Sequence, residues 1–162
     1  MNKTMPHGSR LIALALACAA LSGCKATQPG KVESKIATWT KLHVTVGGKK
    51  DVNPVKATAE NIDEGKQLFA SYCMVCHGYD GQNTGVPFAN TLAPRVPSLA
   101  SPEVQAYTDG QLKWIIQNGL YPSGMPPSEG EFSNEEMWQM VAFIRHLPPK
   151  GSLGVPSVYG GK

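Results

Sequence analysis

The stretch CMVCH at residues 73–77 decides how this chain is interpreted. Two cysteines on one helical turn can reach the same edge of a porphyrin, and the histidine that follows can turn beneath the ring and offer a nitrogen to its iron. This C-x-x-C-H pattern is typical of covalent haem attachment. We therefore predict one covalent haem c, attached through Cys73 and Cys76, with His77 as an axial ligand of the iron.

Two other readings of the cysteine pair are weaker. A thioredoxin-like redox pair shares the C-x-x-C spacing, but it follows a strand in an α/β fold, whereas here a helix is expected before the motif. A structural zinc site needs two further ligands nearby. Residues 60–148 contain no other cysteine, and His146 is distant in the sequence. The motif therefore favours haem.

Met125 is the predicted second axial ligand. A methionine thioether is a frequent partner of histidine on haem iron and raises the reduction potential. Met125 lies in the irregular stretch 123–127, with Gly124 before it and two prolines after it. Glycine permits a close backbone approach and proline stiffens a loop, so this segment can hold a side chain against a ring.

The other candidates for the second axial position are less suitable. Met137 and Met140 share a helical face, where packing in the core is the usual role of methionine. Met74 lies inside the attachment motif and cannot cross the ring. His43 and His146 are less favoured alternatives for the second axial ligand.

Three main helices are expected between residues 60 and 148. Each begins with a capping-box pattern, in which Ser, Thr or Asn is followed three residues later by Glu or Gln. The pairs are Asn61/Glu64, Thr108/Gln111 and Ser133/Glu136. The helices should end near residues 72 and 118 and before Pro148, and a short helix should begin at 101–103. No strong strand pattern occurs here, so the predicted fold class is all-α.

Further motifs accompany the attachment stretch. They are Gly65 and Phe69, Pro97-Ser98-Leu99, Gly119, Gly124-Met125-Pro126, Trp138 and Ala142-Phe143-Ile144-Arg145. With them, residues 60–148 resemble the class I monohaem cytochromes c of the bacterial type. The resemblance implies that the first and last helices cross, with Gly65 against Phe143. It also implies that a backbone carbonyl at Pro97, or else Pro94, accepts a hydrogen bond from the ligand histidine.

The charges divide the chain into two parts. Residues 24–59 contain seven lysines and two acidic residues, a net charge of +5, whereas residues 60–148 contain four basic and ten acidic residues, a net charge of −6. An acidic domain repels phosphates, so nucleic acid is excluded as its partner.

The N-terminus resembles an export signal. Basic residues precede an apolar run over 11–21, and the run ends in LSGC at 21–24, which resembles a bacterial lipobox. We expect Cys24 to be acylated, which would make the chain an exported lipoprotein anchored on the periplasmic side of a membrane. An ordinary cleaved signal and an uncleaved anchor are the alternatives.

The predicted organisation has four parts. They are a lipoprotein signal peptide (1–23), a basic tether (24–59) with a short strand at 42–46, a class I cytochrome c domain (60–148) and a C-terminal tail (149–162). The expected function is electron transfer between a redox donor and acceptor without catalysis of its own. The alternatives are a cytochrome subunit of a dehydrogenase or oxidase, a peroxidase-like enzyme and a haem-based gas sensor.

Overall fold

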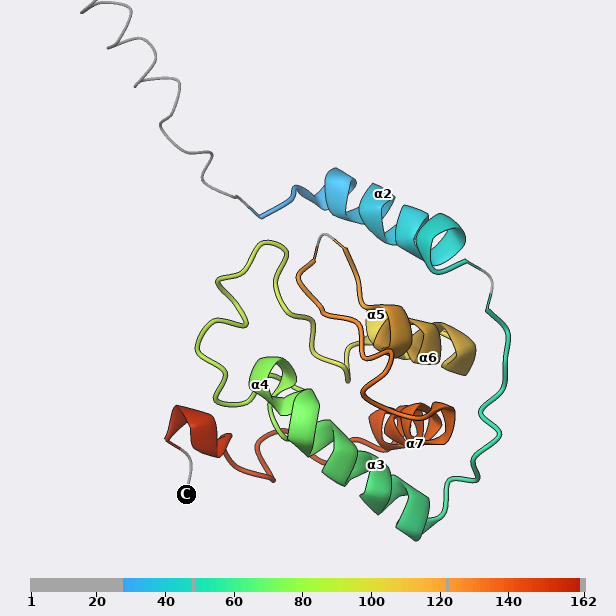
Figure 1. Cartoon of the computed structure of the whole chain (residues 1–162). Coiled ribbons are helices and arrows are strands. Elements are labelled where there is room, and N and C mark those ends of the chain that lie inside the picture. Colours follow the sequence, from blue (N-terminus) through green and yellow to red (C-terminus); the bar gives the residue numbers. More distant parts are fainter. Residues whose placement is uncertain (1–27, 48, 122, 161–162) are drawn as a thin grey trace, which may run out of the picture.

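The computed structural model describes residues 28–47, 49–121 and 123–160, and within these ranges the chain is helical (Figure 1). In chain order the helices are α2 (Lys31–Thr40), the π-helical η1 (Lys41–Thr45), α3 (Ala59–Tyr72), α4 (Met74–His77), α5 (Pro102–Gln105), α6 (Asp109–Asn118), α7 (Asn134–Arg145) and the 3-10 helix η2 (Ser157–Tyr159). Only isolated β-bridges accompany them in the described residues. The predicted all-α fold with three main helices, α3, α6 and α7, is confirmed.

Helices α3 and α7 cross at Gly65. A Cβ atom on Gly65 would lie 2.1 Å from the carbonyl oxygen of Gln139, so a residue with a side chain does not fit. The partner of Gly65 therefore differs from the expected Phe143. The Phe143 ring instead lies against Phe69, with ring centroids 5.2 Å apart. Phe69 follows Gly65 by four residues, about one helical turn, and Phe143 follows Gln139 by the same number.

The local start signals of the helices are largely confirmed. The predicted caps accept hydrogen bonds from the backbone of their helices at Ser101, Thr108 and Ser133. Helix α3 differs, because its cap is Thr58, whose Oγ1 accepts from the Asn61 N–H at 3.2 Å. The side-chain amide of Asn61 is engaged elsewhere and donates to the Lys56 carbonyl at 2.9 Å.

The strand predicted at residues 42–46 is wrong. Residues 41–45 continue α2 as a π-helix, which ends where the Val46 N–H donates to the Lys41 carbonyl at 2.8 Å. A lone strand leaves its backbone groups without partners, whereas a helix satisfies them within the segment. The described part of the predicted tether is therefore partly helical.

The described residues between η1 and α3 run along the right-hand side of Figure 1 and contact the domain. Val46 is 1% exposed and belongs to the core. Gln111 of α6 donates to the Gly47 carbonyl at 2.8 Å, and Asn53 donates to the Trp138 carbonyl of α7 at 2.9 Å. These contacts fix the segment to the two helices that it crosses.

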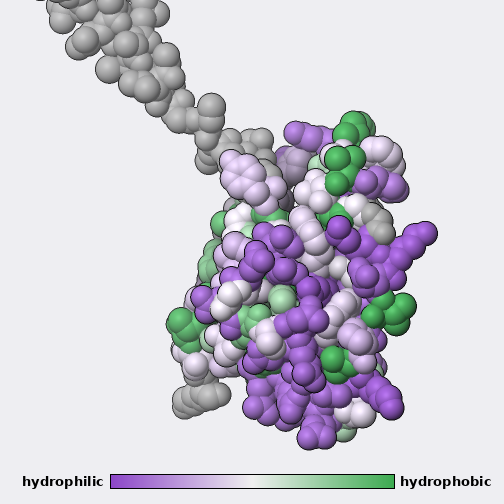
Figure 2. Space-filling view, turned by 45° about the vertical axis from the view of Figure 1, so that its right-hand side comes forward, coloured by the Kyte–Doolittle hydropathy of each residue, from purple (hydrophilic) through white to green (hydrophobic). Residues whose placement is uncertain are grey.

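The hydrophobic core is built mainly from α3, α6 and α7. Met137 and Met140 are 5% and 0% exposed within it, as expected for methionines on a helical face. Most of the surface in Figure 2 is hydrophilic, and hydrophobic residues lie at the top of the molecule, where Figure 1 draws α2, and in separate patches lower down.

Candidate haem site

The attachment motif forms a tight turn after α3. Cys73 ends α3 and begins the four-residue helix α4, and its carbonyl accepts hydrogen bonds from the N–H groups of Cys76 at 3.2 Å and His77 at 3.0 Å. Gly78 ends α4 with a φ of 71°, a backbone conformation that favours glycine. One helical turn therefore carries both cysteines and the histidine.

Neither cysteine forms a disulfide, and both lie where burial disfavours the thiolate. Burial, assisted by the neighbouring Cys76, raises the pKa of Cys73 to about 12, and burial also raises the pKa of Cys76. Redox-active C-x-x-C pairs have a lowered thiol pKa instead. Across the described ranges, no group of three or more His, Cys, Asp and Glu side chains is arranged to hold a metal ion. The redox-dithiol and zinc alternatives therefore gain no support here.

The ring of His77 lies against the core with one nitrogen unsatisfied. Its centroid is 6.3 Å from that of Phe69. Burial lowers the pKa of His77 to about 4, so the imidazole is neutral near pH 7. The backbone carbonyl of Pro97 lies beside the ring and partly offsets this lowering of the pKa. The buried Nδ1 has no well-formed hydrogen bond to any of the described residues. A neutral imidazole held beside a carbonyl fits a histidine ligand of iron.

Asp80 organises the loop that follows the motif. Its side chain is fully buried and accepts hydrogen bonds from Gln82 N at 2.8 Å, Thr84 Oγ1 at 2.5 Å and Gly151 N at 2.7 Å. Burial alone raises the pKa of Asp80, but the hydrogen bonds outweigh it and leave the pKa below the ordinary value of 3.8. An ionised Asp80 therefore stabilises the loop after the motif and joins it to the C-terminal tail at Gly151. The same loop leads to Pro97.

A short hairpin after α6 holds Met125. The Leu120 N–H donates to the Met125 carbonyl at 3.1 Å, and the two residues form an isolated antiparallel bridge. Gly119 lies beneath the hairpin, and a Cβ there would be 2.5 Å from the Met125 carbonyl oxygen. Met125 is partly buried and packs against the edge of the core, as Cys73 does. The backbone of the predicted ligand is thus fixed by its neighbours.

Residues 60–144, just over half of the chain, match the family model described as cytochrome c oxidase, cbb3-type, subunit III. The chain belongs to this family. It is a class I c-type cytochrome, an electron-transfer protein with one covalently bound haem c. The unpaired cysteines and the neutral imidazole of His77 beside the Pro97 carbonyl fit that group. When bound, haem supplies an iron that alternates between two oxidation states.

Two curated relatives of the cytochrome are named as dehydrogenases. It is 27% identical over 140 residues to the quinohemoprotein alcohol dehydrogenase ADH IIB of Pseudomonas putida, covering 86% of this chain and 16% of the relative. It is 28% identical over 115 residues to a 1-butanol dehydrogenase (cytochrome c) of Thauera butanivorans, covering 71% of this chain and 14% of the relative. The cytochrome thus spans a small fraction of each relative's length.

Two solved structures resemble the cytochrome. One chain of the reducing HAO-like protein complex of Kuenenia stuttgartiensis is 21% identical with a TM-score of 0.49, over 57% of this chain and 46% of that one. Cytochrome CL of Methylophaga aminisulfidivorans is 20% identical with a TM-score of 0.43, over 78% of this chain and 71% of that one.

The C-terminal tail of the cytochrome closes over the attachment motif, a feature that the sequence did not reveal. The Tyr159 hydroxyl donates to the Val75 carbonyl, between the two cysteines, at 2.7 Å. The Tyr159 ring meets Phe88 edge-on, with centroids 6.2 Å apart. Val155 packs so closely on Gly85 that a Cβ there would lie 2.4 Å from Val155 Cγ1. The tail therefore supports the motif and its following loop.

Two other supporting residues escaped the sequence analysis. Tyr72, at the end of α3, donates through its hydroxyl to the Pro127 carbonyl at 3.3 Å, which joins the attachment turn to the Met125 loop. Asp80 had one usable signal, because Asp followed by Gly81 is a frequent turn pair. Tyr72 and Tyr159 had none, since their partners are distant in the sequence.

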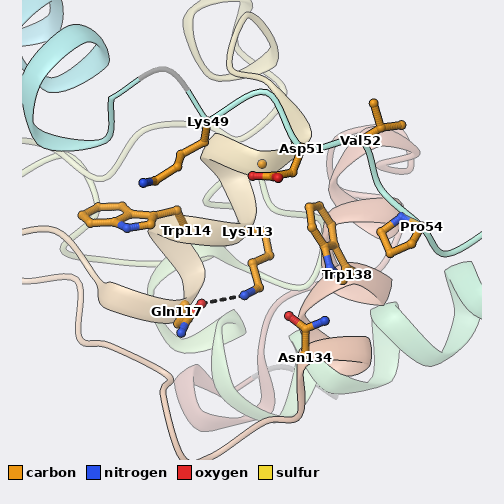
Figure 3. A pocket seen from close by; sticks show the side chains of 10 residues that line it. Lys49, Asp51, Val52, Pro54, Lys113, Trp114, Gln117, Asn134 and Trp138 are labelled. Carbon is orange, nitrogen blue, oxygen red and sulfur yellow. Dashed lines mark hydrogen bonds between the residues drawn. The ribbon is translucent and has the colours of Figure 1, made fainter.

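A surface hollow of about 490 Å³ lies elsewhere on the cytochrome (Figure 3). It is bounded by residues 49–54, α6 and α7, and Lys113 donates to Gln117 at 2.6 Å along its wall. None of Cys73, Cys76, His77 and Met125 lines it. The hollow is therefore separate from the candidate haem site.

Proposed function

We propose that this cytochrome carries electrons on a haem attached through Cys73 and Cys76, with His77 and Met125 as the two axial ligands. The proposal is supported by the position of Met125 after α6, where its carbonyl accepts a hydrogen bond from the Leu120 N–H and its side chain packs against the edge of the core. A thioether presented on a fixed backbone binds iron without ordering a loop first, so the ligand is retained through each oxidation and reduction.

Filled axial positions distinguish a carrier from an enzyme or a gas sensor. Carbon monoxide added to the reduced holoprotein at neutral pH should bind negligibly, because Met125 occupies the sixth position. The variant Met125→Ala should bind it readily, and the core variant Met140→Leu should behave like the wild type. Rapid binding to the wild type would favour a peroxidase-like enzyme or a sensor.

The cytochrome is proposed to be exported and anchored by an acyl group on Cys24. This residue lies outside the described residues, and the proposal rests on the lipobox-like LSGC at 21–24 and the preceding basic and apolar segments. No helix in the described part of the chain is long and apolar enough to cross a membrane.

Labelling cells with a palmitate analogue tests this anchor. The wild type should carry the label, Cys24→Ala should lose it, and Cys18→Ala should keep it, because Cys18 lies in the segment that is cleaved off. A label on Cys24→Ala would refute acylation at this position.

The electron donor or acceptor is proposed to be a dehydrogenase or another respiratory complex. The named relatives support a dehydrogenase, since the cytochrome matches a short part of each. The ten acidic residues between 60 and 148 favour a partner with a basic docking face. The cytochrome could be a subunit of the dehydrogenase or a free carrier, and mild detergent extraction followed by native electrophoresis distinguishes the two. A subunit should migrate with dehydrogenase activity, whereas a free carrier should migrate alone and reduce its partner at a rate that falls with salt.

A further inference from the structure

Helix α2 presents an apolar stripe to the solvent. Val32, Ile36 and Trp39 are 72%, 61% and 58% exposed. They are four and three residues apart, the spacing that places side chains on one face of a helix. The indole of Trp39 also stacks on the His43 ring, with centroids 4.7 Å apart, which extends the stripe into η1. We call these four residues the α2 stripe.

The domain does not cover the α2 stripe. Helix α2 has no buried residue, and its partly buried member is Ser34. Lys41, seven residues further on, is also partly buried, and burial lowers its pKa. Residues seven apart share a face, so the helix turns a polar side towards the protein and its apolar side outwards. A helix that packs on its own domain does the reverse.

The stripe lies in the basic part of the chain. Lysines 31, 35, 41, 49 and 50 accompany a single acidic residue, Glu33, between residues 28 and 50. At 100° per residue, Lys31 and Lys35 fall beside the stripe. The acidic excess lies in residues 60–148 instead. An anionic surface would therefore attract the segment around α2 and repel the acidic cytochrome domain.

We propose that α2 lies flat in the headgroup region of an anionic lipid bilayer, with the α2 stripe inserted and the flanking lysines on the phosphates. An exposed apolar face bordered by lysines and carrying a tryptophan is the composition of interfacial helices. Figure 1 draws α2 above the rest of the domain. Its partly buried residues, Ser34 and Lys41, lie opposite the α2 stripe, so the cytochrome domain would face away from the lipid.

This position of α2 rests on the membrane anchor proposed above at Cys24. Cys24 and Lys31 are seven residues apart, at most about 25 Å of extended chain, so an acyl group on Cys24 would hold α2 within reach of the same membrane. The helix would then convert a loose tether into a fixed orientation of the domain.

The test uses a chain that cannot be acylated. The holoprotein of residues 24–162 with Cys24→Ser, exported behind a cleavable signal, is sedimented with phosphatidylcholine vesicles that contain or lack phosphatidylglycerol. The bound fraction is read from haem absorbance. The chain should bind the anionic vesicles and be released by salt. Val32→Glu/Ile36→Glu should weaken binding at least about tenfold, because two apolar side chains no longer enter the bilayer.

The matched control is Val52→Glu/Val158→Glu, which alters two apolar residues that are 82% and 59% exposed outside α2. It should bind like the parent chain. Equal binding by the α2 variant and the parent, or no binding by either, would overturn the inference. A parent dimer in sedimentation velocity that Val32→Glu/Ile36→Glu dissociates would show that a second copy covers the stripe instead, which also overturns it. Because no acyl group is present, these results leave the palmitate test of Cys24 untouched.

Discussion

Gly65 of α3 and Gln139 of α7 meet backbone to backbone, and a Cβ on Gly65 would lie 2.1 Å from the Gln139 carbonyl oxygen. The crossing fixes α3, and α3 ends directly at the attachment turn. The position of the haem-attachment motif thus depends on a contact between two residues that do not themselves bind the haem.

Gly65→Ala should therefore destabilise the protein strongly. The clash is with backbone atoms that cannot rotate away, so the expected loss in the free energy of unfolding is about 3 kcal/mol, the upper part of the usual range for overpacking. Gly30→Ala is the control, because a Cβ there meets nothing within 4 Å, and it should change the stability by less than about 0.5 kcal/mol. Denaturant unfolding of both holoproteins measures the difference, and equal midpoints would refute the crossing.

Met125→Ala should lower the reduction potential while the haem stays attached. Loss of the thioether removes the ligand that favours the reduced iron, and a fall on the order of 100 mV is expected within the span of about 0.8 V that axial ligands cover. Met140→Leu, in the core, should leave the potential nearly unchanged. Spectroelectrochemical titration measures all three proteins, and an unaltered potential in Met125→Ala would remove this residue from the iron.

Asp80→Asn should destabilise the protein at neutral pH by about 2 kcal/mol, because a buried carboxylate with charge-assisted hydrogen bonds is replaced by an amide that cannot accept them all. The pKa of Asp80 is lower in the folded protein than the ordinary 3.8. On acidification the unfolded chain therefore takes up this proton first, and the contribution is lost as the pH falls below about 3.8 through the folded pKa.

Urea unfolding of the wild type and Asp80→Asn across this pH range checks the linkage. The stability difference should be largest above pH 5 and should shrink towards zero in acid. Asp63→Asn, at an exposed site, serves as the control for the loss of one negative charge. A difference that is independent of pH would show that Asp80 is not ionised in the folded protein.

Tyr159→Phe should loosen the tail without unfolding the domain. It removes the hydrogen bond to the Val75 carbonyl, which is partly exposed to solvent, so a loss of about 1 kcal/mol is expected. Amide hydrogen exchange should accelerate in residues 151–160 and change little in α7. Equal exchange rates in the two proteins would show that the hydrogen bond to Val75 does not hold the tail.

Local signals made much of this structure predictable. Thr108 and Ser133 carry their capping partners three residues away, so α6 and α7 could be placed from short stretches of sequence. The surroundings of Met125 distinguished it from Met137 and Met140, since a Gly–Met–Pro loop and a helical face are readable patterns. The role of Met125 on the iron stays a prediction.

Features that depend on distant contacts were not predictable. The partner of Gly65 is set by how two helices cross, which periodicity does not encode. The alternation around Val44 suggested a strand, but no partner strand exists within the described ranges, and the segment is helical. The tail joins Tyr159 to Val75 across 84 residues, and no pattern in either segment indicates that contact.

Covalent attachment of the haem through Cys73 and Cys76 is tested by precipitating the purified holoprotein in acidified acetone. Thioether bonds survive this treatment, so the colour should remain with the polypeptide, and the pyridine haemochrome should give one haem per chain. Cys73→Ala/Cys76→Ala should release all colour into the solvent. Release of the haem from the wild-type chain would show that the haem is not covalently attached.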